Sequence, residues 1–265
     1  MSAEADTTDD TLFDGALRLR QPARKKGYRV NVDALLLAAF AGANEPVRED
    51  RARRLLATGG ATATTAVRRV RHAVDLGAGV GAVGLALLHL GAAARVTFVE
   101  IEPELAALAA WNAEANGWAE RAQTVNADVR AAMTRLRAGA DLVVCNPPYV
   151  SPGRGRVPAV GRGARVGDLD VFLRAARAVA GRRARIAFVY PAIEATTLLT
   201  SMRALGLEPK RLRLVHARIT EPARVVLVEA AAGKPGGLVI EPPLVELEGP
   251  RRSAELAALL TSPRA

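Results

Sequence analysis

The sequence predicts an α/β fold in which a mostly parallel sheet is covered by helices on both faces. From residue 73 onward, short apolar runs rich in Val and Leu alternate with longer runs that have helical spacing. Such alternation is typical of parallel strands that are connected by helices. The last two expected strands are joined by a short connection around residues 219–223. We therefore expect the final strand to be antiparallel to its neighbours.

The apolar runs define the elements in order along the chain. We expect strands at 73–76, 95–100, 122–126, 142–145, 186–190, 211–216 and 225–230. We expect helices between the first six of these strands, at 81–90, 103–116, 130–137, 168–180 and 192–205.

The remaining segments set the expected domain limits. Residues 1–11 are polar and acidic and are expected to be a disordered tail, ahead of one domain at 12–232. Its first part has a short alternating strand at 16–20 and a helix from Ala34, with Asp33 as the expected N-cap. Residues 43–69 are rich in Ala, Thr, Gly and Arg and predict a flexible basic insert. Residues 233–265 predict a C-terminal tail with one short helix at 254–260.

Composition and charge limit the class of protein. Half of the 265 residues are hydrophobic, and Cys145 is the single cysteine, so a large core without disulfides is expected. The sequence lacks an apolar run long enough to cross a membrane and begins with polar residues, which predicts a cytoplasmic protein. The formal net charge of +10 favours a polyanionic partner, with nucleic acid first.

A glycine-rich turn follows the first strand of the regular part. Gly77, Gly79 and Gly81 stand where that strand passes into a helix. Glycines allow the backbone to approach a ligand closely, and a helix N-terminus offers free N–H groups. The letters GVGAVG also match G-x-G-x-x-G, so a dinucleotide remains an alternative, with Glu100 on a ribose in either case.

Acidic side chains near this turn favour a different cofactor. Asp75 precedes the first glycine, where a carboxylate would repel a pyrophosphate but attract the ammonium group of S-adenosylmethionine. Asp128 follows the third strand and is placed either to accept a hydrogen bond from an adenine amine or to cap the next helix. Ile101 and Val129, which follow Glu100 and Asp128, are counted with the same cofactor site.

The fourth strand ends in Asn-Pro-Pro-Tyr. Asn146 supplies a side-chain oxygen, Pro147 a rigid carbonyl and Tyr149 a flat ring. An exocyclic amine could donate its hydrogens to the first two groups while the ring stacks on the target base. These hydrogen bonds would favour the pyramidal nitrogen that attacks a methyl sulfonium. We therefore expect Asn146, Pro147 and Tyr149 to form the catalytic corner.

The motifs DLGAGVG, VEIEPE, NAD and NPPY, in this order, resemble those of class I S-adenosylmethionine-dependent methyltransferases that act on amino or amide nitrogens. This resemblance implies a Rossmann-like, seven-stranded sheet. The segment LRLRQPARKKGYRVNVDALLLAAF is similar to the start of the bacterial tRNA1(Val) adenine-N6 methyltransferase group. That resemblance implies an adenine target next to the tRNA anticodon, and it places Asp33 near the cofactor.

A basic loop follows the catalytic corner and is the expected contact for RNA phosphates. This stretch lacks acidic residues, and we expect its flexible chain to track a nucleic acid backbone. Its basic residues are Arg154, Arg156, Arg162 and Arg165. The histidines are too far apart for metal-ligand spacing, so we expect no metal. The sequence does not determine the oligomeric state, and a monomer is the favoured expectation.

Three alternatives stay open at this point. The Asn-Pro-Pro-Tyr motif also occurs in glutamine-N5 methyltransferases of release factors, although their helical N-terminal domain and P-R-P-E-T-E segment are not visible here. An NAD-dependent oxidoreductase would use GVGAVG but would leave this motif unexplained. A non-catalytic RNA-binding protein would bind tRNA without turnover. Among substrates, rRNA and DNA present the same adenine amine as tRNA.

Overall fold

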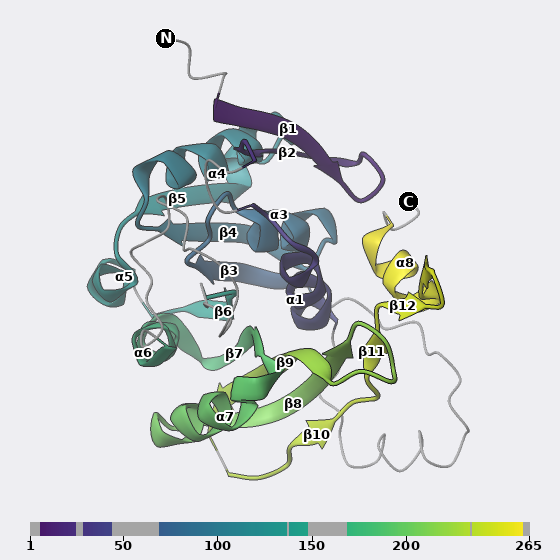
Figure 1. Ribbon diagram of the computed structural model, residues 1–265. Helices are drawn as coiled ribbons and strands as arrows, with labels where there is room; N and C mark the ends of the chain where they lie inside the picture. Colours follow the sequence, from purple (N-terminus) through teal and green to yellow (C-terminus); the bar gives the residue numbers. More distant parts are fainter. Residues whose placement is uncertain are drawn as a thin grey trace.

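The fold is built around one large, twisted sheet, whose strands lie one below another in Figure 1. The computed structural model describes residues 6–24, 29–43, 69–136, 138–147, 169–233 and 235–261. The expected strands of the main sheet are β3 (Val70–Leu76), β4 (Ala93–Glu100), β5 (Ala122–Asn126), β6 (Ala140–Cys145), β7 (Ala180–Pro191), β8 (Leu207–His216) and β9 (Ala223–Ala232).

The strand order confirms the predicted topology. Along the sheet the order is β8-β9-β7-β6-β3-β4-β5, with parallel pairing from β7 to β5. Strand β9 is inserted between β7 and β8 and is antiparallel to both. The usual dinucleotide-binding sheet is mostly parallel and has the strand order 3-2-1-4-5-6, with its last strand at the edge. The antiparallel final strand therefore separates this fold from the dinucleotide-binding alternative.

Helices cover both faces of the sheet, as predicted. On one face lie α1, α3 and α4, whose apolar side chains form one hydrophobic cluster, and on the other lie α5, α6 and α7, which form a second. The bounds of these helices are α1 (Val32–Gly42), α3 (Ala82–His89), α4 (Pro103–Ala115), α5 (Val129–Arg135), α6 (Leu169–Val179) and α7 (Ala195–Ala204). Two 3-10 turns, η2 (Ala119–Arg121) and η3 (Ala192–Glu194), precede β5 and α7.

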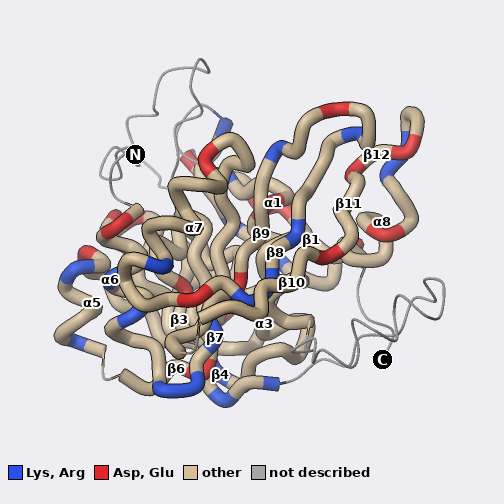
Figure 2. The backbone as a smooth tube through the Cα atoms, turned by 90° about the horizontal axis from the view of Figure 1, so that it is seen from below, with Lys and Arg blue, Asp and Glu red and all other residues tan. Residues whose placement is uncertain are grey.

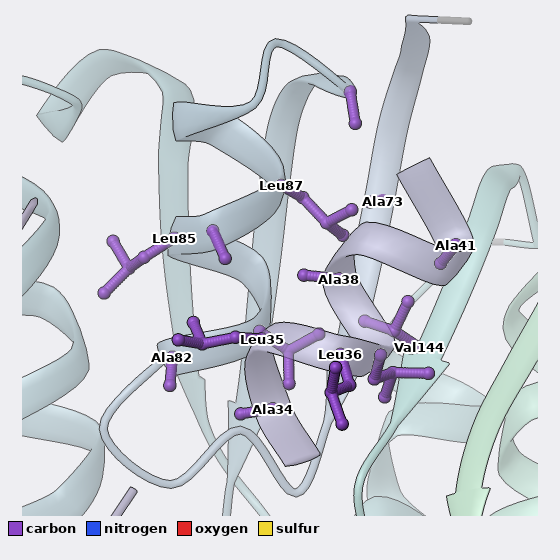
Figure 3. Packing of buried hydrophobic residues seen from close by; sticks show 14 of the residues in the cluster. Ala34, Leu35, Leu36, Ala38, Ala41, Ala73, Ala82, Leu85, Leu87 and Val144 are labelled. Atoms are coloured by element: carbon purple, nitrogen blue, oxygen red, sulfur yellow. The ribbon is translucent and has the colours of Figure 1, made fainter. Parts of the chain in front are cut away.

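Helix α1 lies centrally on the first face. Figure 3 shows Leu36 of α1 beside Val144 of β6, while Leu35 extends toward Ala82 at the start of α3. Almost every residue of α1 is buried, which explains why its sequence is apolar on all sides. The helix begins after Asn31, whose side chain accepts a hydrogen bond from the Asp33 N–H. The expectation that Asp33 is the N-cap was therefore wrong by two residues, because Asn31 already provides the capping oxygen.

Residues 7–11, which were expected to belong to a disordered tail, instead form most of a strand. Strand β1 (Thr7–Leu12) pairs antiparallel with β2 (Leu17–Pro22). The acidic residues that suggested a disordered tail have basic partners, one on β2 and one after it. Asp9 pairs with Arg20 at 2.6 Å, and Asp10 pairs with Arg29 at 2.8 Å. A strand partner and charge neutralisation together order this segment.

The C-terminal segment also has more structure than a tail with one helix. Short strands β10 (Val239–Ile240) and β11 (Leu244–Val245) extend the main sheet at β8, and β12 (Leu247–Glu248) pairs with β13 (Arg251–Arg252). The predicted helix is present as α8 (Ala254–Leu260), with Ser253 as its N-cap. Leu244 and Leu256 are buried in the α1-side cluster, so this segment contributes to the core.

Two predictions fall wholly or mainly outside the described residues. Residues 44–68 and 148–168 are not described. The first range contains most of the basic insert expected at 43–69, and the second contains the loop with the four expected RNA-binding arginines. Within the described ranges, no helix has both the length and the apolar character needed to span a membrane.

Candidate cofactor and catalytic site

The pairing register brings the predicted site residues to one edge of the sheet. Leu76, the last residue of β3, is level with Val99 of β4 and with Cys145 of β6. The next residues along these three strands are Gly77, Glu100 and Asn146. Because the strands are parallel, these residues share the carboxyl edge, where α/β folds bind their ligands.

The glycine turn adopts a backbone that favours glycine. Gly77, Gly79 and Gly81 have φ values of +68°, +56° and +86°. A Cβ on Gly77 would lie 3.0 Å from the Phe172 ring, and one on Gly81 would lie 3.3 Å from Ala109. A Cβ on Gly79 would meet nothing within 4 Å. The turn is therefore packed at its two ends and open at Gly79, as close approach of a ligand requires.

Asp75 lies beneath this turn and is only 1% exposed. Its Oδ2 accepts a hydrogen bond of 2.9 Å from the Gly84 N–H in the first turn of α3. Burial raises the pKa of Asp75 to about 7. The carboxyl group thus connects the end of β3 to the start of α3. Direct contact with a cofactor ammonium, which the sequence predicts, stays a prediction.

Glu100 faces the turn from the neighbouring strand. Its Oε2 accepts a hydrogen bond of 2.7 Å from the Gly79 N–H, and its Oε1 accepts one of 3.0 Å from the Glu102 N–H. Burial raises the pKa of this carboxyl, although these backbone donors act in the opposite direction. With both oxygens held by backbone N–H groups and further lone pairs available, Glu100 has the acceptor capacity to hold a ribose hydroxyl.

The other predicted cofactor residues flank Glu100. Ile101 is 46% exposed, so its apolar side chain is accessible to a ligand at this edge. Asp128 caps α5 by accepting a hydrogen bond from the Arg130 N–H, so its capping role is confirmed. Val129 is the first residue of that helix and is 9% exposed. These positions line the same edge as Glu100, because β5 pairs with β4 up to Glu100.

Asn146 and Pro147 follow β6 on the other side of the turn. The side chain of Asn146 is half-buried, and Pro147 is buried. Since Cys145 is level with Phe188 of β7, this corner lies between the glycine turn and the end of β7. Tyr149, the third predicted catalytic residue, lies outside the described residues.

Asp33 is buried near the same edge and has a cationic partner. Its Oδ1 lies 2.6 Å from a guanidinium nitrogen of Arg224, at the start of β9. Arg224 also pairs with Glu246 of the C-terminal segment at 2.5 Å. Because β9 is antiparallel to β7, its start lies level with the end of β7, at the carboxyl edge. Arg224 thus joins α1, β9 and the C-terminal segment beside the candidate site.

Several residues at the site carried no clear signal in the sequence. Phe172 packs against Gly77, and Asn112 donates a hydrogen bond of 3.0 Å to the Val80 carbonyl within the turn. The pairing of Arg224 with Asp33 joins residues far apart in the chain. The one signal for Asn112 in the sequence is that it is a polar residue on an Ala-rich helix. In the part of the chain that the structure describes, no group of three His, Cys, Asp or Glu side chains could hold a metal ion.

With this geometry established, the central part of the chain can be compared with known protein families. Residues 48–161 match the methyltransferase small domain. The matched segment includes the glycine turn, Glu100, Asp128 and the Asn146 corner. The cofactor of such domains is S-adenosyl-L-methionine, which disfavours a nicotinamide dinucleotide at the glycine turn.

Curated relatives have a more specific name but are matched over part of their length. The chain is 31% identical over 161 residues to a tRNA1(Val) (adenine(37)-N6)-methyltransferase of Edwardsiella ictaluri, covering 60% of this chain and 65% of that protein. It is 35% identical over 88 residues to the protein of the same name in Escherichia coli O9:H4, covering 33% of this chain and 36% of that protein. The matches thus span less than two thirds of these relatives.

Solved structures agree on the fold. A predicted O-methyltransferase from Agrobacterium tumefaciens superposes with a TM-score of 0.61 at 23% identity, covering 86% of this chain and 94% of that chain. Together with the strand order, this similarity confirms the predicted class I methyltransferase fold.

Proposed function

We propose that the protein transfers a methyl group from S-adenosylmethionine to the N6 amino group of an adenine in RNA, with tRNA as the RNA class. The observation that carries this proposal is the position of Asn146. It follows β6 at the carboxyl edge, next in register to Gly77 of the glycine turn. An amide oxygen beside a methyl donor site is suited to an exocyclic amine.

The residues that would hold the cofactor fit its parts. Glu100 has spare acceptor capacity for ribose hydroxyls, and the exposed Ile101 offers an apolar surface for the adenine. The Asp128 carboxylate, which already caps α5, is part-exposed and has lone pairs available for an adenine amine. The open space at Gly79 leaves room for the ligand against the backbone.

Asn146 and Pro147 would act on the target amine. S-adenosylmethionine, when bound, supplies an electrophilic methyl group on a sulfonium. The Asn146 side-chain oxygen and the Pro147 carbonyl accept the two N6 hydrogens, which draws the nitrogen toward a pyramidal geometry with its lone pair free. These hydrogen bonds strengthen as positive charge develops on that nitrogen, so they stabilise the transition state. Water takes the released proton, and no strong general base is required.

Recognition of RNA would involve groups beyond the described residues. We propose that Tyr149 stacks on the target adenine and that the arginines of the following loop contact phosphates. Arg20 and Arg29 of the N-terminal part are paired with Asp9 and Asp10, so they are less suited to phosphate contact. The names of the curated relatives support adenine in tRNA as the target.

The experiment is transfer of radiolabelled methyl from S-adenosylmethionine, offered separately with unmodified tRNA, rRNA, single-stranded DNA and a release factor. We expect label in tRNA as N6-methyladenosine. Asn146→Ala is expected to reduce kcat by roughly 100-fold or more, since one transition-state hydrogen bond is lost. The variant should still bind S-adenosylhomocysteine, which shows that the cofactor site is intact.

Other outcomes would revise the proposal in distinct ways. Label in the release factor alone would make the target a glutamine amide and would contradict the RNA assignment. Label in rRNA or DNA would change the nucleic acid but keep the chemistry. Binding of tRNA and S-adenosylhomocysteine with no transfer to any of these acceptors would contradict catalysis on them.

A further inference from the structure

Asn112 of α4 and Asn116, the residue that caps the end of α4, bind the backbone of β2 in the way a neighbouring strand would. The Asn116 side chain accepts a hydrogen bond from the Arg18 N–H at 2.9 Å and donates one to the Arg18 carbonyl at 2.8 Å. One helical turn earlier, Asn112 does the same with the N–H and carbonyl of Arg20, at 2.6 Å and 2.9 Å. Figure 1 shows the β1–β2 hairpin lying over α4.

Asn112 differs from Asn116 in where its third hydrogen bond goes. Asn112 Nδ2 also donates to the Val80 carbonyl at 3.0 Å, inside the glycine turn between Gly79 and Gly81. Asn116 Nδ2 donates its other hydrogen bond to the Asn112 carbonyl, within α4 itself. Each side chain therefore makes three hydrogen bonds, but only Asn112 reaches the cofactor turn.

The surroundings make this contact rigid. Asn112 is 0% exposed, so water cannot replace its hydrogen bonds without a rearrangement. The same helix also approaches the turn through Ala109, since a Cβ on Gly81 would lie 3.3 Å from it. The turn is thus held on one side by Asp75 through α3 and on the other by Asn112 of α4.

We infer that Asn112 is a positioning residue that couples the N-terminal hairpin to the glycine turn, and thereby sets the affinity for the cofactor. An amide suits this role because it combines one acceptor with two donors in one plane. A carboxylate could not donate to the two carbonyls. The inference rests on S-adenosylmethionine as the ligand of the turn, and it is independent of which acceptor is methylated.

The first test compares Asn112→Ala with Asn116→Ala, since each removes three side-chain hydrogen bonds. Binding of S-adenosylhomocysteine is measured by calorimetry at a temperature where both variants are fully folded. We expect Asn112→Ala to raise Kd about tenfold, because the Val80 carbonyl loses its partner and the turn is freed. We expect Asn116→Ala to change Kd by less than about twofold. Equal effects of the two variants would overturn the inference.

The second test uses the unaltered protein and so does not depend on the stability of a variant. Coupling is reciprocal, so cofactor binding should also stabilise the hairpin. We expect S-adenosylhomocysteine to slow hydrogen exchange at the Arg18 and Arg20 amides of β2, with no change in α7 on the opposite face. Protection limited to residues 77–84 would overturn the coupling while leaving the cofactor assignment intact. Failure of the unaltered protein to bind the probe would overturn both.

Discussion

Gly79 and Gly117 have nearly the same local geometry and differ in location. Both have positive φ, +56° and +74°, and at both a Cβ would meet nothing within 4 Å. Gly117 follows α4, whereas Gly79 is in the glycine turn. Alanine at either position should cost only the left-handed backbone strain, about 1–2 kcal/mol.

The first prediction uses this matched pair. Gly79→Ala is expected to weaken S-adenosylhomocysteine binding at least tenfold, because the new methyl group occupies space beside the cofactor. Gly117→Ala should lose similar stability without loss of affinity. Chemical denaturation and calorimetry on both variants measure the two effects. Equal affinities for the two variants would show that the cofactor does not approach Gly79.

Asp75 gives a prediction about pH. Burial raises the pKa of Asp75 from 3.8 to about 7. At a pH between these two values, the folded protein therefore holds a proton on Asp75 that the unfolded chain has released. The free energy of unfolding should therefore fall as pH rises through this interval and level off above it. Asp75→Asn removes the titration. The free energy of unfolding of this variant, relative to that of the unaltered protein, should therefore rise by on the order of 2–3 kcal/mol between about pH 5 and pH 8.

The measurement is urea unfolding of both proteins across that pH range. Parallel stability curves would show that Asp75 does not titrate as inferred. Affinity for S-adenosylhomocysteine at about pH 8 then tests the predicted ammonium contact. A large loss in Asp75→Asn supports direct or water-mediated contact, and unchanged affinity limits the residue to its hydrogen bond with Gly84.

Among individual residues, the sequence predicted those that stand at the ends of strands. It did not predict those whose side chains connect one helix or strand to another. The carboxyl ends of parallel strands meet, so Gly77, Glu100 and Asn146 could be placed at one edge from their order alone. Asn112 and Arg224 could not, because their partners depend on how a hairpin and a last strand pack. Such contacts have no local pattern.

At the scale of elements, the terminal segments departed most from expectation. Polar composition predicted disorder at residues 1–11, but opposite charges on β2 and after it order strand β1. The C-terminal segment looked like a tail because its strands are only two residues long. It is anchored by ion pairs, among them that of the buried Arg211 with Glu241 at 2.8 Å. Regular alternation predicted the central elements well because each is long and buried.

The corresponding prediction concerns α8. Leu256 is 4% exposed and packs into the α1-side cluster, whereas Leu259 is only partly buried against it. Leu256→Ala is expected to lower the free energy of unfolding by about 2–4 kcal/mol, and Leu259→Ala by roughly 1 kcal/mol. Chemical denaturation measures both. If Leu256→Ala cost no more than Leu259→Ala, the C-terminal segment would not be part of the cooperative fold.

At the scale of the whole molecule, the net charge of +10 does not by itself give an RNA-binding face. Basic and acidic positions are interspersed along the described chain in Figure 2. Many arginines have internal partners, as Arg185 and Arg211 do in sharing Glu229. If the surplus charge acts on RNA, its position relative to Asn146 should matter more than its amount.

The last prediction separates position from amount with two variants of equal charge. Both replace four arginines by glutamine and reduce the formal net charge equally. The loop variant changes Arg154, Arg156, Arg162 and Arg165, which follow the proposed catalytic corner in the sequence. The control variant changes exposed arginines at or near the starts of β3, β4 and β7, on the opposite edge of the sheet, namely Arg69, Arg95, Arg182 and Arg183.

Binding of tRNA to both variants is measured as a function of salt concentration. Each lost phosphate contact should reduce the slope of log K against log salt by about 0.7–0.9, so the loop variant should lose roughly 3 from its slope. The control variant should keep most of its slope, because its arginines face away from the site. Equal losses in the two variants would mean that net charge alone attracts the RNA. A loop variant with an unchanged slope would remove residues 154–165 from the proposed interface.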